Sequence, residues 1–403
     1  MLNLILAALL LFPLIQSQTP QISQSLSIYW RQHCTTTIFH AFDSVNGAIS
    51  IDTSPLTPPM NPRFATVNST AWEQWYFDSI SSNGESNSVI TFFRDPSLDV
   101  LGLGSLWVMH DAVWSNGTRA STIEFVEEAM VVVCPGYTFG LWNSSSQSSE
   151  FTFNVTSDST QASISVSTLK TQGTLNVTTL GPARYPDGLL YPDKHGSLFF
   201  APMLWWVEAV PAGNTQVDFE IGGSEIGFTG YGGVDYFAGS YIWDYICKDW
   251  YWMRGVVGPY SIVFWQFTSA IDNNTYTSAF LVQNGAVIFS TQNSGLDISG
   301  PQDSYANITL LYGTGHGVVT APMGLNDTGY ALDFVEGITN GVAGRRWHFE
   351  TQHQNVGFST LPGINSVYTR FADSAKGGQN EQKVYKGAMN TEQFVTKVVY
   401  PLI

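Results

Sequence analysis

Charged residues are scarce in this 403-residue chain. They make up 12% of it, about half of the ~25% that is usual in globular proteins. Acidic residues outnumber basic ones by 32 to 16, which gives a net charge of −16. Phosphate groups are bound by clustered lysine and arginine, so this balance argues against nucleic acid or an anionic membrane as a partner. Aromatic residues, at 14%, are abundant instead.

Cysteine is also rare, with Cys34, Cys134 and Cys247 the only three. This odd number allows one disulfide plus a buried thiol, and it excludes a fold held by a framework of bridges. The seven histidines show no paired spacing of the kind that binds a metal. A Gly-x-Ser-x-Gly elbow and a phosphate-binding loop are missing as well. The motifs therefore indicate neither a metal nor an organic cofactor.

Long apolar runs are missing except at the start of the chain. Leu2 to Leu14 is almost wholly apolar, and Ile15-Gln16-Ser17 offers a small residue for cleavage, so residues 1–17 are predicted to be a signal peptide. The run is too short to span a bilayer stably. We therefore expect a mature chain, from Gln18, that has no integral membrane segment and follows the secretory pathway.

Eight Asn-x-Ser/Thr sequons agree with that compartment. They begin at Asn68, Asn116, Asn143, Asn154, Asn176, Asn273, Asn307 and Asn326. A chain so rich in serine and threonine acquires several sequons by chance. Together with the leader, they predict an N-glycosylated protein that is secreted or held in vesicles or the vacuole.

Two aromatic segments organise the rest of the chain. Trp72 to Asp78 is followed, after a polar turn, by the apolar run Ser88 to Phe93. The same arrangement returns when Cys247 to Arg254 leads through a turn into Tyr260 to Trp265. Each pair predicts a β-hairpin, and the repetition predicts two related β-domains. Their expected bounds are an N-terminal arm at 18–62, a first domain at 63–230 and a second domain at 231–403.

Short alternating runs fill both halves of the chain. Period-two alternation of β-branched and aromatic residues, broken by Asn, Gly and Pro, is typical of strands, and no long amphipathic helix is evident. The glycine-dense stretch Gly222 to Gly233 is interpreted as the connector between the domains, and Ser374 to Gln382 as a loop. We expect an all-β protein with two lipocalin-like barrels or sandwiches packed side by side.

Several motifs, in a fixed order, resemble the fungal Diels-Alderase family, which is more distantly related to carotenoid hydratases. They are Thr70 to Asp78, the Gly232-Gly233-Val234-Asp235 turn, Val257-Gly258-Pro259-Tyr260, Thr328 to Glu336 and Arg346-Trp347-His348-Phe349. The family usually has Trp a few residues after the Gly-Gly-x-Asp turn. This chain has Tyr236-Phe237-Ala238 there, which indicates a reshaped pocket.

The resemblance implies a cofactor-free enzyme with a pocket near the domain junction. It implies a [4+2] cycloaddition on small hydrophobic substrates. Most members of the family close a decalin ring within one polyketide chain. A smaller group couples a tropolone-derived ortho-quinone methide to a humulene-type sesquiterpene in an intermolecular hetero-Diels-Alder reaction, and its members look secreted and glycosylated, as this chain does. We therefore favour the hetero-Diels-Alder hypothesis.

Aromatic residues just after the expected connector are the main site candidates. Arg254, on the same strand face as Trp250, could donate to a carbonyl or pair with an acid such as Asp249 or Glu73. A cycloaddition needs apolar partners held face to face and a donor for the carbonyl of the diene. For any single aromatic residue, a core position is the more common role. The candidates are Arg254 and Tyr241 for catalysis, and Trp75, Trp243, Trp250, Trp252, Trp265 and Trp347 for substrate binding.

Three other functions remain open from the sequence. A glycosidase needs two facing carboxylates, for which the groups Glu124, Glu127 and Glu128, or Asp218 and Glu220, could be offered. A hydratase needs one acid to protonate an alkene, and Asp235 is the candidate. A lipocalin-type carrier would have a similar apolar pocket without chemistry. Glu73 and Asp78 are interpreted as structural carboxylates.

Overall fold

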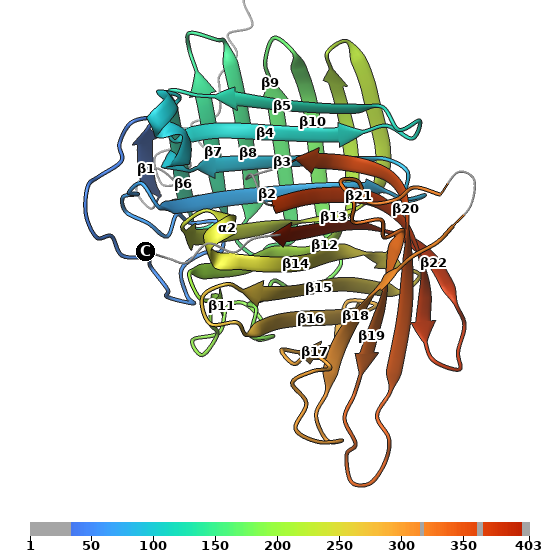
Figure 1. Cartoon of the computed structure of the whole chain (residues 1–403). Coiled ribbons are helices and arrows are strands. Elements are labelled where there is room, and N and C mark those ends of the chain that lie inside the picture. Colours follow the sequence, from blue (N-terminus) through green and yellow to red (C-terminus); the bar gives the residue numbers. More distant parts are fainter. Residues whose placement is uncertain (1–33, 315–317, 361–365, 397–403) are drawn as a thin grey trace, which may run out of the picture.

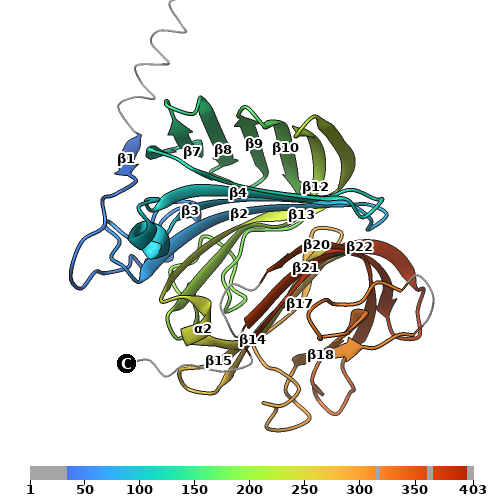
Figure 2. The ribbon, with the colours of Figure 1, turned by 45° about the horizontal axis from the view of Figure 1, so that its top comes forward.

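The computed structural model describes residues 34–314, 318–360 and 366–396. The expected signal peptide and the start of the arm lie outside the described residues. Nearly all regular structure is β, in two large antiparallel sheets that lie against each other (Figures 1 and 2). The two sheets confirm the all-β expectation, with the first curled into a half-barrel and the second into a nearly closed barrel.

The first sheet has the order β1-β6-β7-β8-β9-β10-β12-β13-β2-β3-β4-β5, with β11 beside β12. Its strands are β1 (Thr35–His40), β2 (Ala71–Ser81), β3 (Asn87–Arg94), β4 (Leu106–Val113), β5 (Arg119–Phe125), β6 (Glu128–Cys134), β7 (Tyr137–Ser144), β8 (Ser149–Thr156), β9 (Gln161–Ser167), β10 (Thr171–Thr179), β11 (Phe199–Ala201), β12 (Leu204–Ile221) and β13 (Ser224–Ser240). A 3-10 helix, η1 (Pro96–Leu101), connects β3 to β4.

The second sheet has the order β17-β16-β15-β14-β22-β21-β20-β19-β18. Its strands are β14 (Cys247–Val257), β15 (Tyr260–Ser269), β16 (Thr275–Gln283), β17 (Ala286–Thr291), β18 (Tyr305–Leu311), β19 (Gly329–Val335), β20 (Arg346–Thr360), β21 (Ser366–Gln379) and β22 (Tyr385–Thr396). One short helix, α2 (Trp243–Ile246), links the two sheets.

Both expected hairpins form. β2 pairs with β3, and β14 pairs with β15, each in antiparallel register. The segment expected to be a loop, Ser374 to Gln382, instead largely continues β21, which pairs on one side with β20 and on the other with β22. Glycine there allows close approach, because a Cβ at Gly377 would overlap Phe349.

The expected domain boundary at residue 230 lies inside β13, and the first sheet continues to Ser240. The glycines that suggested a connector serve close packing of strands. A Cβ at Gly230 or Gly232 would overlap the carbonyl oxygens of Ile80 or Asp78 on β2, and one at Gly233 would meet the guanidinium of Arg254. The chain passes from one sheet to the other between Ser240 and Cys247.

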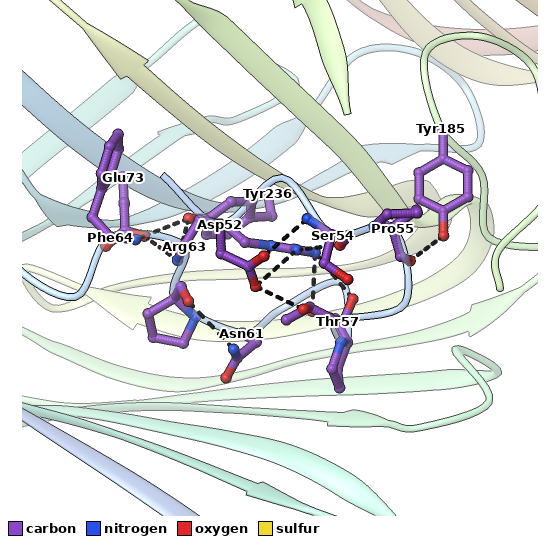
Figure 3. Close-up of polar contacts among 12 residues, drawn as sticks. Asp52, Ser54, Pro55, Thr57, Asn61, Arg63, Phe64, Glu73, Tyr185 and Tyr236 are labelled. Carbon is purple, nitrogen blue, oxygen red and sulfur yellow. Dashed lines mark hydrogen bonds and ion pairs between the residues drawn. The ribbon is translucent and has the colours of Figure 1, made fainter. Parts of the chain in front are cut away.

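The end of the N-terminal arm and the residues just after it pack into the core of the half-barrel. Met60, Phe64 and Val67 are buried in the core of the first sheet, and β1 pairs with β6 beside the Cys34–Cys134 disulfide. Figure 3 shows how buried Arg63 holds the arm, donating to the carbonyl oxygens of Ser54 (2.8 Å) and Thr57 (3.0 Å). The arm therefore forms part of the first core. Cys247 is a buried free thiol.

Candidate functional site

A cavity of about 510 Å³ lies between the two sheets. This volume is in the range of small-molecule sites. Its lining comes from both sheets and from both short helices: Gln74, Tyr76, Thr91, Phe93, Leu98, Trp107, Met109, Ile123, Phe237, Trp243, Trp250, Trp252, Trp265, Phe358, Thr360, Tyr368, Arg370 and Glu392. We call this cavity the between-sheet pocket.

Strand alternation decides which side chains of the first sheet reach this pocket. Gln74 and Tyr76 on β2 point to the face that meets the second sheet, whereas Trp75 and Phe77 point into the core of the half-barrel. Across β3 the register places Phe93 opposite Gln74. This face of the first sheet therefore forms one wall of the pocket.

The walls of the pocket are mainly aromatic. Phe93 and Trp107 stack with ring centroids 3.5 Å apart and planes 7° apart. On the opposite side Trp243 contacts Trp250 at 4.6 Å, and Trp265 meets Phe237 edge-on at 5.4 Å. Such faces present flat apolar surface at fixed positions, which suits conjugated or unsaturated ligands.

A charged network occupies one part of the lining. Arg370 donates from Nε to Glu392 (2.6 Å), from a terminal nitrogen to Asp111 (3.0 Å) and from the other to the hydroxyl of Tyr368 (2.8 Å). The hydroxyl of Tyr76 donates to the same Glu392 oxygen (2.6 Å). These bonds join β21 and β22 of the second sheet to β2 and β4 of the first.

Burial and charge pairing shift the pKa values of these groups in opposite directions. Burial opposes the charge of Arg370, but the neighbouring Tyr368, Tyr76 and Glu392 hold its pKa well above the usual value. Burial raises the pKa of Asp111 although Arg370 opposes this rise, and burial also raises the pKa of Tyr76. At neutral pH the network therefore consists of an ionised arginine and protonated phenols.

Several lining side chains carry unpaired donors, among them the indole N–H groups of Trp107, Trp252 and Trp265. Gln74 is the lining residue that adds an amide. Its side chain is half-buried in the pocket between Phe93 and Phe237 on the neighbouring strands. Within the described part of the chain, its amide has no hydrogen-bond partner. It therefore offers an available N–H donor surrounded by aromatic rings.

Four of the tryptophans proposed from the sequence meet in the pocket: Trp243, Trp250, Trp252 and Trp265. The other two lie elsewhere. Trp75 is fully buried in the half-barrel core and donates its indole N–H to Met60 (2.8 Å). Trp347 is buried in the barrel core against Phe289. Around Trp75 both faces of β2 are covered, so alternation alone does not identify the pocket face there. Trp347 alternates with the exposed Arg346 and the half-buried His348, so it lies on the single buried face of β20, which is the barrel core.

Neither proposed catalytic residue lines the pocket. Tyr241 lies at the start of the link between the sheets, where its backbone carbonyl accepts the indole N–H of Trp72 (2.8 Å). Its backbone is left-handed (φ 68°) and its side chain is partly exposed. Tyr241 is thus positioned as a linker residue.

Arg254 is fully buried behind the pocket wall, with its guanidinium 5.0 Å from the ring of Trp252. It pairs with Asp78, with Asp235 (2.5 Å) and with Glu208 (3.1 Å) on three strands of the first sheet. Burial opposes its charge, but these carboxylates hold the pKa of Arg254 above its usual value. Arg254 therefore joins the two sheets. The sequence had offered pairing with an acid as the alternative to catalysis, and the structure shows such pairing, although with other acids than Asp249 and Glu73.

The carboxylates offered for other reactions also lie away from the pocket. Asp235, the hydratase candidate, is buried against Arg254, and burial raises its pKa well above the usual range. Asp218 and Glu220 are exposed on β12. Among the described lining residues, Glu392 is the single carboxylate. The facing pair that a glycosidase requires is not assembled there.

A family model described as Diels-Alderase-like matches residues 31–396. The chain belongs to the Diels-Alderase-like family. The resemblance proposed from the sequence is confirmed, and family membership makes the protein a pericyclase, an enzyme of cycloaddition, that acts on small hydrophobic substrates.

Individual relatives of this Diels-Alderase-like protein agree with the family model. It is 32% identical over 360 residues to Diels-Alderase poxQ of Penicillium oxalicum, with 89% of this chain and 78% of the relative covered. It is 30% identical over 391 residues to hexane cyclase gkaB of Penicillium citrinum, with 93% and 86% covered. The crystal structure of CghA with Sch210972 superimposes with a TM-score of 0.74 at 20% identity, covering 90% of this chain and 99% of that one, which supports the fold.

Sequence reasoning missed the polar part of the pericyclase pocket. Gln74 and Tyr76 lie inside the aromatic motif, and alternation would have separated them from Trp75 had the pocket face been known. Arg370 and Glu392 lie on β21 and β22, in runs without a recognisable motif. Their proximity is a property of the tertiary fold.

Two further observations concern partners. Among residues 34–314, 318–360 and 366–396, no cluster of three or more His, Cys, Asp or Glu side chains is arranged to hold a metal ion. No helix within these ranges is long and apolar enough to cross a membrane.

Proposed function

We propose that this pericyclase catalyses an intermolecular hetero-Diels-Alder reaction in the between-sheet pocket. The partners would be a tropolone-derived ortho-quinone methide and an alkene of a humulene-type sesquiterpene. The observation that carries the proposal is the pocket itself, which has aromatic walls on two sides and one available amide donor at Gln74. It supports a reaction that needs stacking and one hydrogen bond rather than a nucleophile or a proton relay.

The two walls would supply most of the catalysis by positioning. A planar quinone methide fits against Phe93 and Trp107 on one side, and the alkene against Trp243 and Trp250 on the other. Binding both partners in contact removes the translational entropy cost from the bond-forming step, which can contribute several kcal/mol, with about 7–11 kcal/mol the limit for ideal orientation.

The amide of Gln74 would supply the electronic contribution. In a hetero-Diels-Alder reaction of a quinone methide, negative charge accumulates on the carbonyl oxygen as the ring becomes aromatic. A donor held in a water-poor aromatic surrounding stabilises that charge more in the transition state than in the ground state. Gln74 is suited to this role because no acceptor in residues 34–314, 318–360 or 366–396 competes for its N–H groups.

A carrier function is supported less well by the same structure. Lipocalin-type carriers hold their ligands inside the barrel. Here the interior of the second barrel is filled by core side chains, including Trp347, Phe349 and Tyr330. The half-barrel is filled by its own aromatic residues and by the arm.

We further propose that the protein passes through the secretory pathway and carries N-glycans. Five of the eight sequon asparagines have exposed side chains, which leaves room for a glycan: Asn116, Asn154, Asn176, Asn273 and Asn326. Mass spectrometry of glycosidase-treated peptides, with conversion of Asn to Asp at these positions, tests this proposal. Unmodified asparagine at all eight sequons in protein from a fungal host would refute it.

The reaction is tested by incubating the purified glycoprotein with a generated tropolone quinone methide and humulene, beside a sample without enzyme. These partners also react unaided, so rate and enantiomeric excess must both be measured. One enriched enantiomer formed faster than in the control supports the proposal. An unchanged racemic product contradicts it, and cyclisation of a linear polyenoyl tetramic acid instead would establish an intramolecular decalin-forming reaction.

A further inference from the structure

The charges around the between-sheet pocket restrict what it can bind. Among the described lining residues, only Arg370 and Glu392 carry charge. Both are buried, with exposed fractions of 1% and 6%. We infer that the pocket selects uncharged ligands and excludes anions, an inference that rests on the proposed function and narrows its substrate class.

The positive charge of Arg370 is fully matched inside the protein. Its Nε and one terminal nitrogen bond two carboxylates, Glu392 (2.6 Å) and Asp111 (3.0 Å), and the other terminal nitrogen bonds Tyr368. Glu392 is stabilised as an anion by the hydroxyl of Tyr76 as well. The network therefore has a net charge of zero with Asp111 protonated and −1 with Asp111 ionised.

The next ionisable groups, behind Trp252, are also matched inside the protein. Arg254 and Arg184 are paired with Asp78, Asp235 and Glu208, so three carboxyl groups surround the two guanidinium groups. An anionic ligand would lose its hydration on entering the aromatic pocket and would meet no unpaired cation among the described lining residues in exchange.

This balance separates two chemical classes of cycloaddition substrate. An acyl 1,3-dicarbonyl compound, such as a tetramic acid, is an enolate anion at neutral pH. A quinone methide and an alkene are uncharged. The pocket matches the uncharged class, with Gln74 as a neutral donor for a carbonyl oxygen.

A binding experiment tests charge selection without any reaction. The probes are a fluorescent 18-carbon conjugated tetraenoic acid and its primary amide, which have nearly equal size but differ by one charge at about pH 8. We expect the amide to bind the wild-type protein at least tenfold more tightly than the carboxylate. Equal affinities, or tighter binding of the carboxylate, would overturn the inference.

Glu392→Gln gives a second test, in which binding of the anionic probe should become tighter. The amide oxygen of glutamine can still accept from Tyr76 and Arg370, while the loss of one negative charge leaves Arg370 less compensated. We expect the affinity for the carboxylate probe to rise at least tenfold, with less than a threefold change for the amide probe. Glu225→Gln, an exposed position on β13, is the matched control and should change neither.

Circular dichroism and thermal unfolding establish whether Glu392→Gln folds, and the wild-type comparison tests the inference even if it does not. The binding measurement and the turnover measurement can refute their two proposals independently. Amide selectivity without cycloadduct formation would refute the proposed reaction and keep charge selection. Cycloadduct formation with equally tight carboxylate binding would refute charge selection alone.

Discussion

Replacing Gln74 by leucine isolates the hydrogen bond that the proposed reaction requires. Leucine keeps most of the side-chain volume between Phe93 and Phe237 and removes only the amide. The amide of Gln74 makes no hydrogen bond to any residue that the structure describes, so its loss breaks no hydrogen bond there. We therefore expect the folded yield and the melting temperature of Gln74→Leu to match those of the wild type.

The expected loss of rate follows from the type of donor. A neutral hydrogen bond contributes about 1 kcal/mol net, and one oxyanion-hole donor contributes about 3–4 kcal/mol. A quinone methide oxygen gains only part of a unit charge in the transition state, so the effect lies towards the lower value. About 1.4 kcal/mol corresponds to a tenfold slower enzymatic reaction.

The assay measures the enzyme-dependent rate after the uncatalysed rate is subtracted, together with enantiomeric excess. Gln216→Leu is the matched control, because Gln216 is an exposed glutamine on β12, remote from the pocket lining. We expect kcat to fall about tenfold in Gln74→Leu, with KM nearly constant because the bond strengthens mainly in the transition state. An unchanged kcat in a folded Gln74→Leu variant would refute the role of this donor.

Three further predictions concern the pocket wall, the ion pairs that join the two sheets, and the pH dependence of stability. Trp243 is a half-exposed residue of the pocket wall, so Trp243→Ala should lower product selectivity with little loss of stability. Trp347→Ala, in the barrel core, should cost about 3–5 kcal/mol of folding free energy. Equal losses of stability for the two variants in urea unfolding would contradict this contrast. Arg254→Met should destabilise the fold by about 3–5 kcal/mol because Asp78 and Asp235 lose their cation and Glu208 keeps only Arg184, while exposed Arg119→Met should have no effect on the denaturation midpoint. Although burial opposes its charge, Asp373 and Asp327 raise the pKa of His353 from 6.5 to about 9, so this residue should contribute about 3 kcal/mol of stability below pH 6.5 that is lost as pH rises to about 9. Urea midpoints of the wild type and His353→Gln should converge over that range, and a constant difference would refute the assignment.

Local pattern was sufficient to predict most of the fold. An aromatic segment followed by a turn and an apolar run, at Trp72–Phe93 and again at Cys247–Trp265, predicted the hairpins β2–β3 and β14–β15, because two strands joined by a short turn pair with each other. The glycines at 230–233 were misinterpreted as a connector, since the same residue serves turns and close strand packing. Whether these glycines form a turn or a close strand contact depends on the neighbouring strand β2, which the sequence alone does not place.

The sequence predicted some residues of the candidate site, and the rest depend on contacts between strands that are distant in the chain. The density of aromatic residues near Trp243 and Trp250 drew attention to residues that line the between-sheet pocket, and their role in binding stays a prediction. Trp75 and Trp347 face filled cores. At Trp75 both faces of β2 are covered, and a sequence does not reveal which of two covered faces leaves a cavity. Arg254 shares a strand face with Trp252, yet it is paired there by carboxylates of three other strands.

The most direct measurement is a crystal structure of the protein bound to its cycloadduct. We expect electron density between the sheets, with the ring formed in the reaction lying between Trp107 and Trp250 and its oxygen within hydrogen-bond distance of Gln74. A cycloadduct bound at any other place, with the between-sheet pocket closed or occupied only by water, would show that this pocket is not the active site.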